Sequence, residues 1–259
     1  MKKLTQASRA AVSSLSGAGP CTARREFPAG ADPETTSRKA GKVTISDSTV
    51  AVIGTGNIGN RLAANFAAGG LSFLLAGRDQ DTARKIAADL DGHAEAVSID
   101  EAVDRADVLV FALWLDVFKQ LIAQYGGRLA GKVIVDPTNP VGPDDAGGYR
   151  KVIGEQESSG QILAALLPPG ARLVKAFGTL SAPTLSAAAR REPERAVQFY
   201  AADDAAAGDL VADLILTGGY EPVRVGGLDQ SIRIEMFGDL HEYGALGRPV
   251  TKAEALQAI

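Results

Sequence analysis

The chain has 259 residues, of which 46% are hydrophobic, and a formal net charge of -4 at pH 7. This length and composition are typical of a globular α/β protein of one large domain or two small ones, and no apolar run reaches the roughly 18 residues of a membrane helix. The negative charge gives no general electrostatic case for nucleic acid or an anionic membrane as partner, while one cysteine and two distant histidines exclude an internal disulfide and disfavour a zinc site.

Residues 1–46 differ from the rest of the chain, since they are rich in Ser, Ala, Gly, Arg and Thr and show no sustained apolar period. Such a segment cannot bury enough surface to offset its ordering entropy, so we expect a disordered N-terminal extension. A targeting segment and a translation start near Val43 are alternatives that the sequence leaves open. The lone Cys21 lies in this segment and is expected to be a bystander.

Short apolar runs then alternate with helical patterns, which predicts right-handed βαβ units. We expect a Rossmann-type, doubly wound parallel sheet in a dinucleotide-binding domain at residues 47–168. The expected strands are 49–53, 71–76, 94–98, 107–113 and 132–135. The expected helices are 60–68, 80–90, 99–105 and 116–124.

Residues 136–158 form a long irregular stretch with several prolines and glycines, and a loop of this length is more often functional or mobile than accidental. After a helix at 160–167, a smaller C-terminal α/β part is expected at 169–259, with a substrate or dimerisation role. Its expected strands are 172–177, 196–201 and 221–225. Its expected helices are 182–190, 204–216 and an amphipathic helix at 228–243.

The sequence VAVIGTGNIGNR at residues 50–61 places a glycine turn between a buried strand and a helix start. Gly54 permits the tight turn, Gly56 lets backbone N–H groups approach a phosphate, and Gly59 lets the helix pack close to the strand. The free N–H groups and the dipole of the helix start then favour an anion. The alternative is a structural turn without a ligand. The candidate cofactor-binding residues here are Gly54, Thr55, Gly56, Asn57, Ile58 and Gly59.

The end of the second strand, Ala76-Gly77-Arg78, decides which dinucleotide is expected. An acidic residue at this point would bond the ribose hydroxyls of NAD. Gly77 leaves room instead, and the guanidinium of Arg78 can fork onto the 2′-phosphate of NADP. Asp79 would favour NAD if it turned inward, and Arg78 could also be an ordinary solvated charge. We therefore expect NADP(H) as the cofactor.

Several segments in register resemble the NADPH-dependent reductases of the deazaflavin coenzyme F420 and related predicted dinucleotide-binding reductases, over roughly residues 50–241. The segments are VIGTGNIG (52–59), AGRD (76–79), VDPTNP (135–140), LVKAFGT (173–179) and FYAADDAAA (199–207). Three departures from the family pattern stand out. Gly77 and Asp79 replace a Ser and a basic residue, Trp114-Leu115 replaces Pro-Trp, and Gly178 replaces an Asn.

This resemblance implies hydride transfer between NADP(H) and a planar acceptor stacked on the nicotinamide, with coenzyme F420 as the expected co-substrate. It also implies a cytoplasmic protein, commonly a homodimer. Such a transfer depends on placement more than on acid–base groups. That agrees with a sequence that offers no obvious catalytic dyad and no metal site, in which His93 and His241 are expected to be structural or at the surface.

The remaining candidates lie where strands reach the crevice at their carboxyl ends. Ala112 and Leu113 are expected to line the dinucleotide channel. Asn139 bonds the nicotinamide amide or ribose, or else makes an Asx-type turn.

The tentative acceptor residues are Trp114, Pro140, Lys175, Phe177 and Thr179, all near the same crevice. Trp114 stacks on a planar acceptor or only packs. Phe177 lies beside the nicotinamide or in the core. Lys175 meets an anionic tail of the acceptor or points to solvent.

Three further functions remain open. The acceptor could be a flavin, which would make the protein a flavin reductase. The protein could be a regulatory protein that binds NADP without turnover. An enzyme that reduces a small carbonyl or imine would need a proton donor that the sequence does not reveal.

Overall fold

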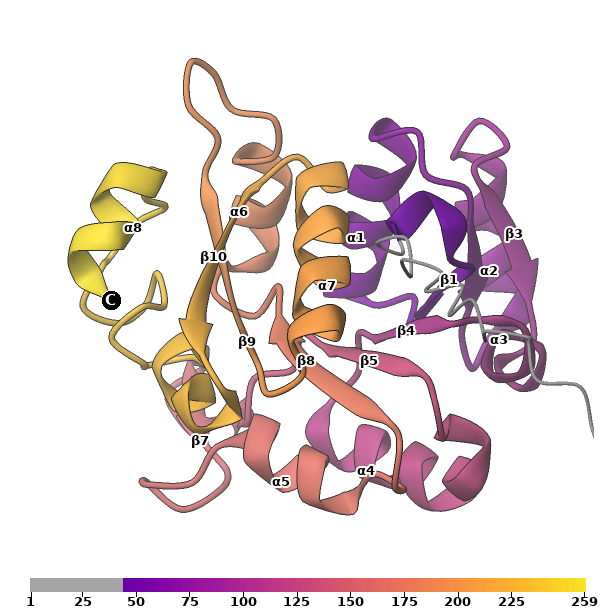
Figure 1. Cartoon of the computed structure of the whole chain (residues 1–259), viewed down its shortest axis with the longest axis horizontal. Helices are drawn as coiled ribbons and strands as arrows, with labels where there is room; N and C mark the ends of the chain where they lie inside the picture. Colours follow the sequence, from indigo (N-terminus) through magenta and orange to yellow (C-terminus); the bar gives the residue numbers. More distant parts are fainter. Residues whose placement is uncertain (1–43) are drawn as a thin grey trace, which may run out of the picture. The chain divides into compact units, whose positions relative to one another are not determined.

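The computed structural model describes residues 44–259 of the chain, so the expectations for the N-terminal extension and Cys21 lie outside the described residues apart from 44–46. Within the described part, one eight-stranded sheet has the order β10-β9-β8-β5-β4-β1-β2-β3 (Figure 1). Its strands are β1 (Val50–Ile53), β2 (Phe73–Ala76), β3 (Ala94–Val97), β4 (Val108–Phe111), β5 (Val133–Asp136), β8 (Arg172–Ala176), β9 (Val197–Ala202) and β10 (Glu221–Gly226).

The helices connect these strands largely as expected. The α-helices are α1 (Asn57–Ala68), α2 (Gln80–Ala88), α3 (Ile99–Arg105), α4 (Leu115–Tyr125), α5 (Ser159–Leu166), α6 (Ala182–Ala187), α7 (Ala205–Thr217) and α8 (Lys252–Ala258). Short 3-10 helices are η1 (Ile45–Asp47), η2 (Gly126–Leu129) and η3 (Leu228–Ile234). No helix described between residues 44 and 259 is long and apolar enough to cross a membrane.

Helices cover both faces of the sheet and bury a separate core on each (Figure 1). Residues of α1, α2, α6 and α7 pack in the core on one face, and residues of α3, α4 and α5 pack in the core on the other. Successive residues of β1 alternate between the two cores, which explains why this strand is apolar throughout. The predicted Rossmann-type, doubly wound fold is confirmed.

The strand order reverses at β1, which has β2 on one side and β4 on the other, and both pairings are parallel. The chain proceeds outward from β1 to β3 and then returns to β4 on the opposite side. In open α/β sheets, such a switch point leaves a crevice at the carboxyl ends of the two central strands, and ligands bind there. The topology therefore places the loops after β1 and β4 on either side of the candidate site.

The eight-stranded sheet contains one antiparallel pair, because β9 runs opposite to β8. The helix α6 between these two strands has 6 residues, so the helix expected at 182–190 was too long. β10 pairs with β9 in parallel, so these last two strands run opposite to the other six strands of the sheet.

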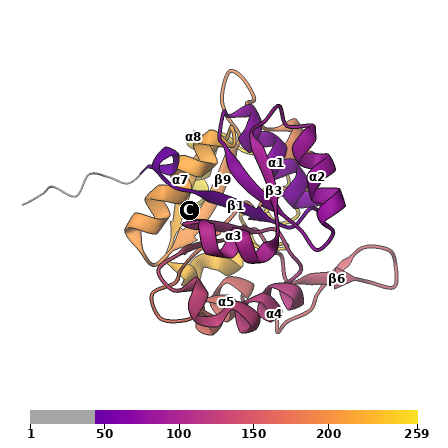
Figure 2. The same ribbon diagram turned by 90° about the vertical axis from the view of Figure 1, so that its right-hand side faces the viewer.

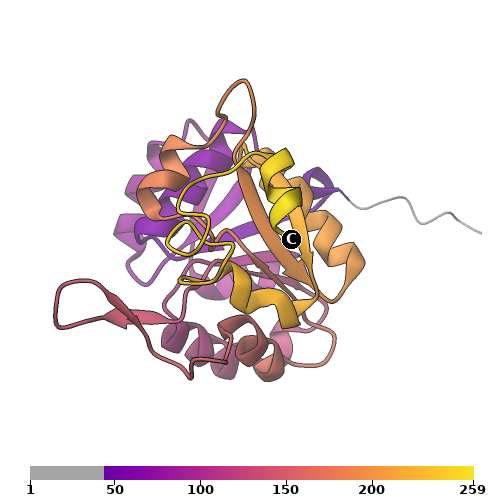
Figure 3. The same ribbon diagram turned by 90° about the vertical axis from the view of Figure 1, so that its left-hand side faces the viewer.

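A hairpin lies within the stretch expected to be irregular. β6 (Val141–Pro143) and β7 (Tyr149–Lys151) pair antiparallel and form a two-stranded sheet of their own. The hairpin projects from the body of the domain, as Figures 2 and 3 show. A bond from Val152 N to Pro140 O, 2.9 Å long, closes its base.

The prediction of an amphipathic helix over residues 228–243 was wrong. The short η3 ends at Ile234, and Glu235 takes an extended conformation. A Cβ on Gly238 would lie 2.4 Å from the carbonyl oxygens of Ile232 and Arg233, so the chain turns back on itself at this glycine. The apolar spacing reflects core packing instead, since Ile234 and Leu240 are buried against β9 and β10.

Helix α8 was missed, although the sequence carries a signal for it. Thr251 and Glu254 form a capping box, in which the Thr251 hydroxyl accepts from the Glu254 N–H and the carboxylate accepts from the Thr251 N–H. This Thr-x-x-Glu spacing is a recognised helix start. The pattern after it is only 7 residues long and has little apolar periodicity.

Candidate functional site

Two helices differ from the others at their N-termini. Each of α2, α3, α5, α6, α7 and α8 begins with a side chain that accepts a bond from the first turn. No side chain caps α1, which begins after Gly56, or α4, which begins after Trp114. These two helices follow β1 and β4, the strands of the switch point. Their free N–H groups and dipoles make the crevice between them attractive to an anion.

The three glycines of the loop after β1 meet different steric demands. Gly54 has a φ of 119°, and a Cβ there would lie 2.3 Å from Ala112 O. A Cβ on Gly59 would lie 1.8 Å from Gly54 O, so the helix can pack this closely only with glycine. A Cβ on Gly56 would meet nothing within 4 Å, which leaves open space in front of the helix start. That space is where a phosphate would approach the backbone.

The end of β2 carries a free cation beside a carboxylate that is already engaged. Arg78 is exposed and has no hydrogen bond or ion pair to any residue of the described part. Asp79 caps α2 and accepts bonds from Asp81 N (2.9 Å), Thr82 N (3.3 Å) and Thr82 Oγ1 (2.9 Å). The Thr82 hydroxyl, and then the two N–H groups, hold the pKa of Asp79 below its usual range. Both oxygens of Asp79 therefore serve the helix.

Gly77 makes room for Thr55 of the glycine loop. A Cβ at Gly77 would lie 2.8 Å from Thr55 Oγ1 and 2.9 Å from its Cγ2. The Thr55 hydroxyl is therefore held over the end of β2, next to Arg78 in the chain. The structure brings the glycine loop and the Arg78 segment together, as the sequence led us to expect.

The loop after β4 lies against the glycine loop. Ala112 contacts both Gly54 and Gly59, and Leu113 Cδ2 would lie 3.2 Å from a Cβ on Gly54. Thr138 Oγ1 donates to Leu113 O over 3.1 Å and so joins the ends of β4 and β5. Trp114 is 59% exposed at the start of α4. Its indole is available to a ligand and does not pack in the core.

Asn139 connects three segments at the end of β5. Its Nδ2 donates to Gly178 O (2.9 Å), and its Oδ1 accepts from Met236 N (2.6 Å). The side chain thus uses both of its polar atoms within the protein. The turn at this point is made by Asp136 instead, whose Oδ1 accepts from Thr138 N. Asn139 holds the loops after β5, β8 and η3 to one another.

Lys175 lies in a buried charge cluster, away from solvent. Its Nζ is 2.8 Å from Asp136 Oδ2, 2.9 Å from Ser159 Oγ and 3.6 Å from Glu235 Oε1, and it donates to the Thr138 carbonyl. Both carboxylates of the cluster are buried too. Of the two surroundings considered from the sequence, solvent is wrong, because this ammonium is buried among protein groups.

Glu235 completes this cluster from the far end of the chain. Its carboxylate accepts bonds from Ser158 Oγ (3.0 Å), Ser159 N (3.2 Å), Ser159 Oγ (2.8 Å) and Gly160 N (3.0 Å) at the start of α5. The helix dipole and these donors stabilise the second negative charge that Lys175 alone does not balance. Sequence reasoning missed Glu235, because nothing in its local pattern distinguishes it.

The other tentative acceptor residues lie inside the protein. Phe177 is fully buried and packs edge-on against Phe66, with ring centroids 5.7 Å apart. Its φ of 62° is unusual for a residue with a side chain. Thr179 is buried and donates to Gln198 Oε1 over 2.9 Å, and Pro140 is buried at the base of the hairpin.

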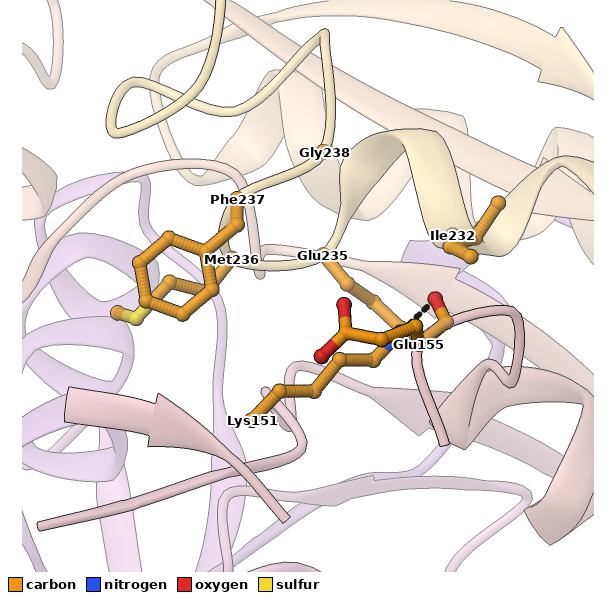
Figure 4. Close-up of a pocket in the computed structure, with 7 residues that line it drawn as sticks. All are labelled: Lys151, Glu155, Ile232, Glu235, Met236, Phe237 and Gly238. Carbon is orange, nitrogen blue, oxygen red and sulfur yellow. Dashed lines mark hydrogen bonds between the residues drawn. The ribbon is translucent and has the colours of Figure 1, made fainter. Parts of the chain in front are cut away.

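A pocket of about 340 Å³ opens between the end of β7 and the segment around the end of η3 (Figure 4). Met236, whose N–H is bonded to Asn139, lies in its wall. Phe237 is 51% exposed there and has a φ of 73°, a conformation that residues with side chains rarely adopt. The lining residues are Lys151, Glu155, Ile232, Glu235, Met236, Phe237 and Gly238.

His241 is fully buried close to this region. Its Nδ1 accepts from Tyr243 N over 2.9 Å, and its Nε2 is buried, with the backbone of Gly178 as the polar group that favours its protonated form. Burial lowers the pKa of His241 to about 4, although Glu242 opposes the shift. The imidazole is therefore neutral at pH 7. His93 directly precedes the edge strand β3, so it lies at the amino end of the strands, whereas the crevice lies at their carboxyl ends.

Comparison with known proteins agrees with this geometry. Residues 49–140 match the family described as "NADP oxidoreductase coenzyme F420-dependent". The F420-dependent NADP reductase of Methanothermobacter thermautotrophicus is 29% identical over 197 residues, which are 72% of this chain and 84% of that protein. The resemblance to the F420-dependent NADP reductases is confirmed. The chain is an NADP(H)-dependent oxidoreductase.

Solved structures extend the likeness beyond the matched segment. The hypothetical protein SMa0349 from Sinorhizobium meliloti has a TM-score of 0.69 and 28% identity, over 79% of this chain and 96% of that one. A candidate F420-dependent NADP reductase from Arthrobacter sp. fb24 has a TM-score of 0.61 and 23% identity, over 71% and 86% of the two chains. At this identity, the second likeness shows the fold alone.

The structure also shows what surrounds the departures from the family pattern in this oxidoreductase. A Cβ on Gly178 would lie 3.4 Å from Pro137 O, 3.7 Å from Ile234 O and 3.8 Å from Asn139 Oδ1. These are ordinary contact distances, so the backbone could accept a side chain there. The polar link between these loops comes from Asn139, through its bonds to Gly178 and Met236.

Proposed function

We propose that this oxidoreductase transfers a hydride between NADP(H) and a planar acceptor, with coenzyme F420 as that acceptor. The observation that carries the dinucleotide part is the uncapped start of α1 behind the open space at Gly56, at the switch point of the sheet. The name of the Methanothermobacter relative supports F420 as the acceptor.

The residues of the crevice fit a bound NADP(H). The N–H groups of Gly56, Asn57 and Ile58 would hold the diphosphate, with Thr55 beside them. The unpaired guanidinium of Arg78 would hold the 2′-phosphate, since Asp79 is turned into the cap of α2. Ala112 and Leu113 would line the channel between the two helix starts.

A bound nicotinamide supplies the hydride, and the side chains of the protein supply placement. Correct orientation of two reacting carbons lowers the barrier by several kcal/mol without an acid or base. The neutral His241 is buried and held by Tyr243 N, so no proton transfer is assigned to it. Asn139 fixes the loops that would flank both the nicotinamide and the acceptor.

The acceptor would lie in the pocket beside Met236 and Phe237, with Trp114 at the start of α4 as a further aromatic surface. The volume of about 340 Å³ falls within the range of small-molecule sites, roughly 300–1,000 Å³. In this arrangement residues 47–168 bind the dinucleotide, and residues 169–259 contribute one wall of the acceptor site. An open pocket supports turnover over a purely regulatory role.

We further propose that the protein acts as a homodimer, as the resemblance implies. Exposed aromatic side chains at Tyr149, Phe237 and Tyr243 offer apolar surface to a second copy. Sedimentation at several concentrations would measure the association state, and a single monomeric species throughout would remove this part of the proposal.

The test is the oxidation of NADPH, followed by its absorbance, with purified protein and coenzyme F420 or FMN. Turnover with F420 alone would support the proposed reaction. Turnover with FMN alone would make the protein a flavin reductase, since a pocket lined by Met236 and Phe237 would also admit a flavin. Tight NADPH binding without consumption of either acceptor would favour the regulatory alternative.

A further inference from the structure

Arg61 lies one helical turn after the first residue of α1. Its Nη1 donates to Asn57 O over 2.8 Å and is 3.4 Å from Asn57 Oδ1. Helical side chains lean toward the N-terminus, which explains how this long side chain reaches back to the glycine loop. The guanidinium is therefore held beside the uncapped helix start.

The charge of Arg61 is not balanced within the described part of the chain. No carboxylate between residues 44 and 259 pairs with it, and its Nε is buried without a hydrogen-bond partner. The bonds to Asn57 use Nη1 only. Nη2 has no acceptor in residues 44–259 and, unlike Nε, is not buried, so its donors are left to bind a phosphate.

Arg172 shows what a purely structural arginine looks like in this fold. Its Nη2 donates to Gly131 O over 2.7 Å, and its Nε is also buried without a partner. It begins β8, at the opposite end of the strand from the crevice. This bond uses the Nη2 group that Arg61 keeps free, and no uncapped helix start lies at Arg172.

We infer that Arg61 is a second cationic ligand of the dinucleotide, and that it binds the diphosphate. This inference rests on the proposed dinucleotide site. The diphosphate lies off the first-turn N–H groups of α1, whereas the 2′-phosphate lies at the end of β2 beside Arg78. The two arginines therefore divide the anionic groups of the cofactor between them, and only Arg78 tells NADP from NAD.

The experiment measures dissociation constants of NADPH, NADH and 2′-AMP for the full chain and for three variants. Arg61→Gln should weaken NADPH and NADH alike, by roughly ten- to a hundredfold for a lost charged bond, and leave 2′-AMP unchanged because it has no diphosphate. Arg78→Ala should weaken NADPH and 2′-AMP and leave NADH unchanged. Arg172→Gln is the matched control and should change none of the three.

Arg61→Lys adds a second check, since it keeps the charge and loses the planar fork. It should recover part of the affinity for both NADPH and NADH. Far-ultraviolet circular dichroism and the melting temperature of each variant would separate loss of binding from loss of folding.

Each other outcome has a definite meaning. Unchanged NADPH and NADH binding in Arg61→Gln would make Arg61 a structural residue like Arg172. Weakened NADPH and 2′-AMP with intact NADH would place it on the 2′-phosphate, and a changed KM for the acceptor alone would place it at the acceptor. Any of these overturns the inference and leaves the proposed function standing. Failure of the unaltered chain to bind either dinucleotide would remove both.

Discussion

At the scale of single residues, the adjacent Arg78 and Asp79 have different roles. Asp79 is engaged by α2, and Arg78 has no partner in residues 44–259. We expect Arg78→Ala to weaken NADPH binding by about 1.5–3 kcal/mol, the size of a lost charged hydrogen bond, and to leave NADH binding nearly unchanged. Titration calorimetry with both dinucleotides would measure the difference.

The control for this variant is Arg105→Ala. Arg105 ends α3 and forms an exposed ion pair with Glu95, away from the carboxyl ends of the strands. The Arg105→Ala variant should leave the affinities for NADPH and NADH unchanged. An equal loss for NADPH and NADH in Arg78→Ala would contradict the assignment to the 2′-phosphate.

His241 makes the folded state sensitive to acid. Burial lowers its pKa from 6.5 to about 4, while Glu242 and the backbone of Gly178 oppose the shift and Lys175 adds to it. Between these values the unfolded chain binds a proton that the folded chain does not, so the free energy of unfolding falls as the pH falls. The loss over this window is about 3 kcal/mol. Urea unfolding of His241→Gln should therefore depend less on pH than unfolding of the unaltered chain.

The other histidine provides the comparison. His93→Gln should keep the full dependence of stability on pH between 7 and 5, since it leaves His241 in place. The same pH dependence in His241→Gln as in the unaltered chain would show that other groups cause the acid sensitivity.

The positions where the backbone requires glycine could be predicted from the sequence. The hydrogen-bond and ion-pair partners of residues far apart in the chain could not. The roles of Gly54 and Gly59 follow from a local motif, and the structure gives both their close contacts. The partners of Asn139 and Lys175 lie up to 97 residues away, at Met236 and in the cluster with Glu235. Nothing near these residues in the sequence indicates such partners.

At the scale of elements, the loops after β5, β8 and η3 act as one unit held by Asn139. We expect Asn139→Asp to loosen it, because a carboxylate facing Gly178 O replaces a donor with a negative charge. The KM for the acceptor should rise about tenfold, the equivalent of about 1.4 kcal/mol, while the dissociation constant of NADPH stays nearly the same. Steady-state kinetics and direct NADPH binding would check this split.

Asn65→Asp is the matched control for this variant. Asn65 is a buried amide of α1 that donates to Leu185 O (3.0 Å) and Tyr220 Oη (2.9 Å), away from the acceptor pocket. It should lower stability without a specific change in the acceptor KM. If Asn139→Asp lowers only stability, or weakens NADPH equally, Asn139 does not position the acceptor site.

Helices and strands could be predicted where the apolar periodicity extends over many residues. The prediction failed where tertiary contacts override the helical pattern. The strands and helices from β1 to β5 agree with their patterns to within a few residues. The segment after η3 has helical apolar spacing. It does not form a helix, because Glu235 binds the N–H groups at the start of α5 and the chain turns at Gly238. The hairpin was missed because each of its strands has only 3 residues.

At the scale of the whole domain, one sheet joins both predicted parts. β8 pairs with β5 in parallel, although the two strands belong to the parts at 169–259 and 47–168. We expect the strands of both parts to unfold together, because removal of β8 would expose the buried edge of β5. Hydrogen exchange in increasing denaturant should give peptides from β4 and β9 the same opening free energy.

The opposing result would be an earlier opening of residues 172–226 with β1 to β5 still protected. It would show that the C-terminal part unfolds as a unit of its own. The boundary near residue 168 was expected from the family resemblance, in which a larger nucleotide-binding part is followed by a smaller C-terminal part. Only the strand pairing reveals that the sheet continues across this point.

The uncapped start of α1 has a consequence for the life of the protein in a cell. The first-turn N–H groups of α1 have no side-chain cap, so this helix end is less stable without a bound anion. A dinucleotide that binds only the folded chain would therefore protect it from unfolding and proteolysis. At a dinucleotide concentration a hundred times the dissociation constant, this protection amounts to about 2.7 kcal/mol. The abundance of the protein would then rise and fall with the supply of nicotinamide nucleotide, with no dedicated regulator.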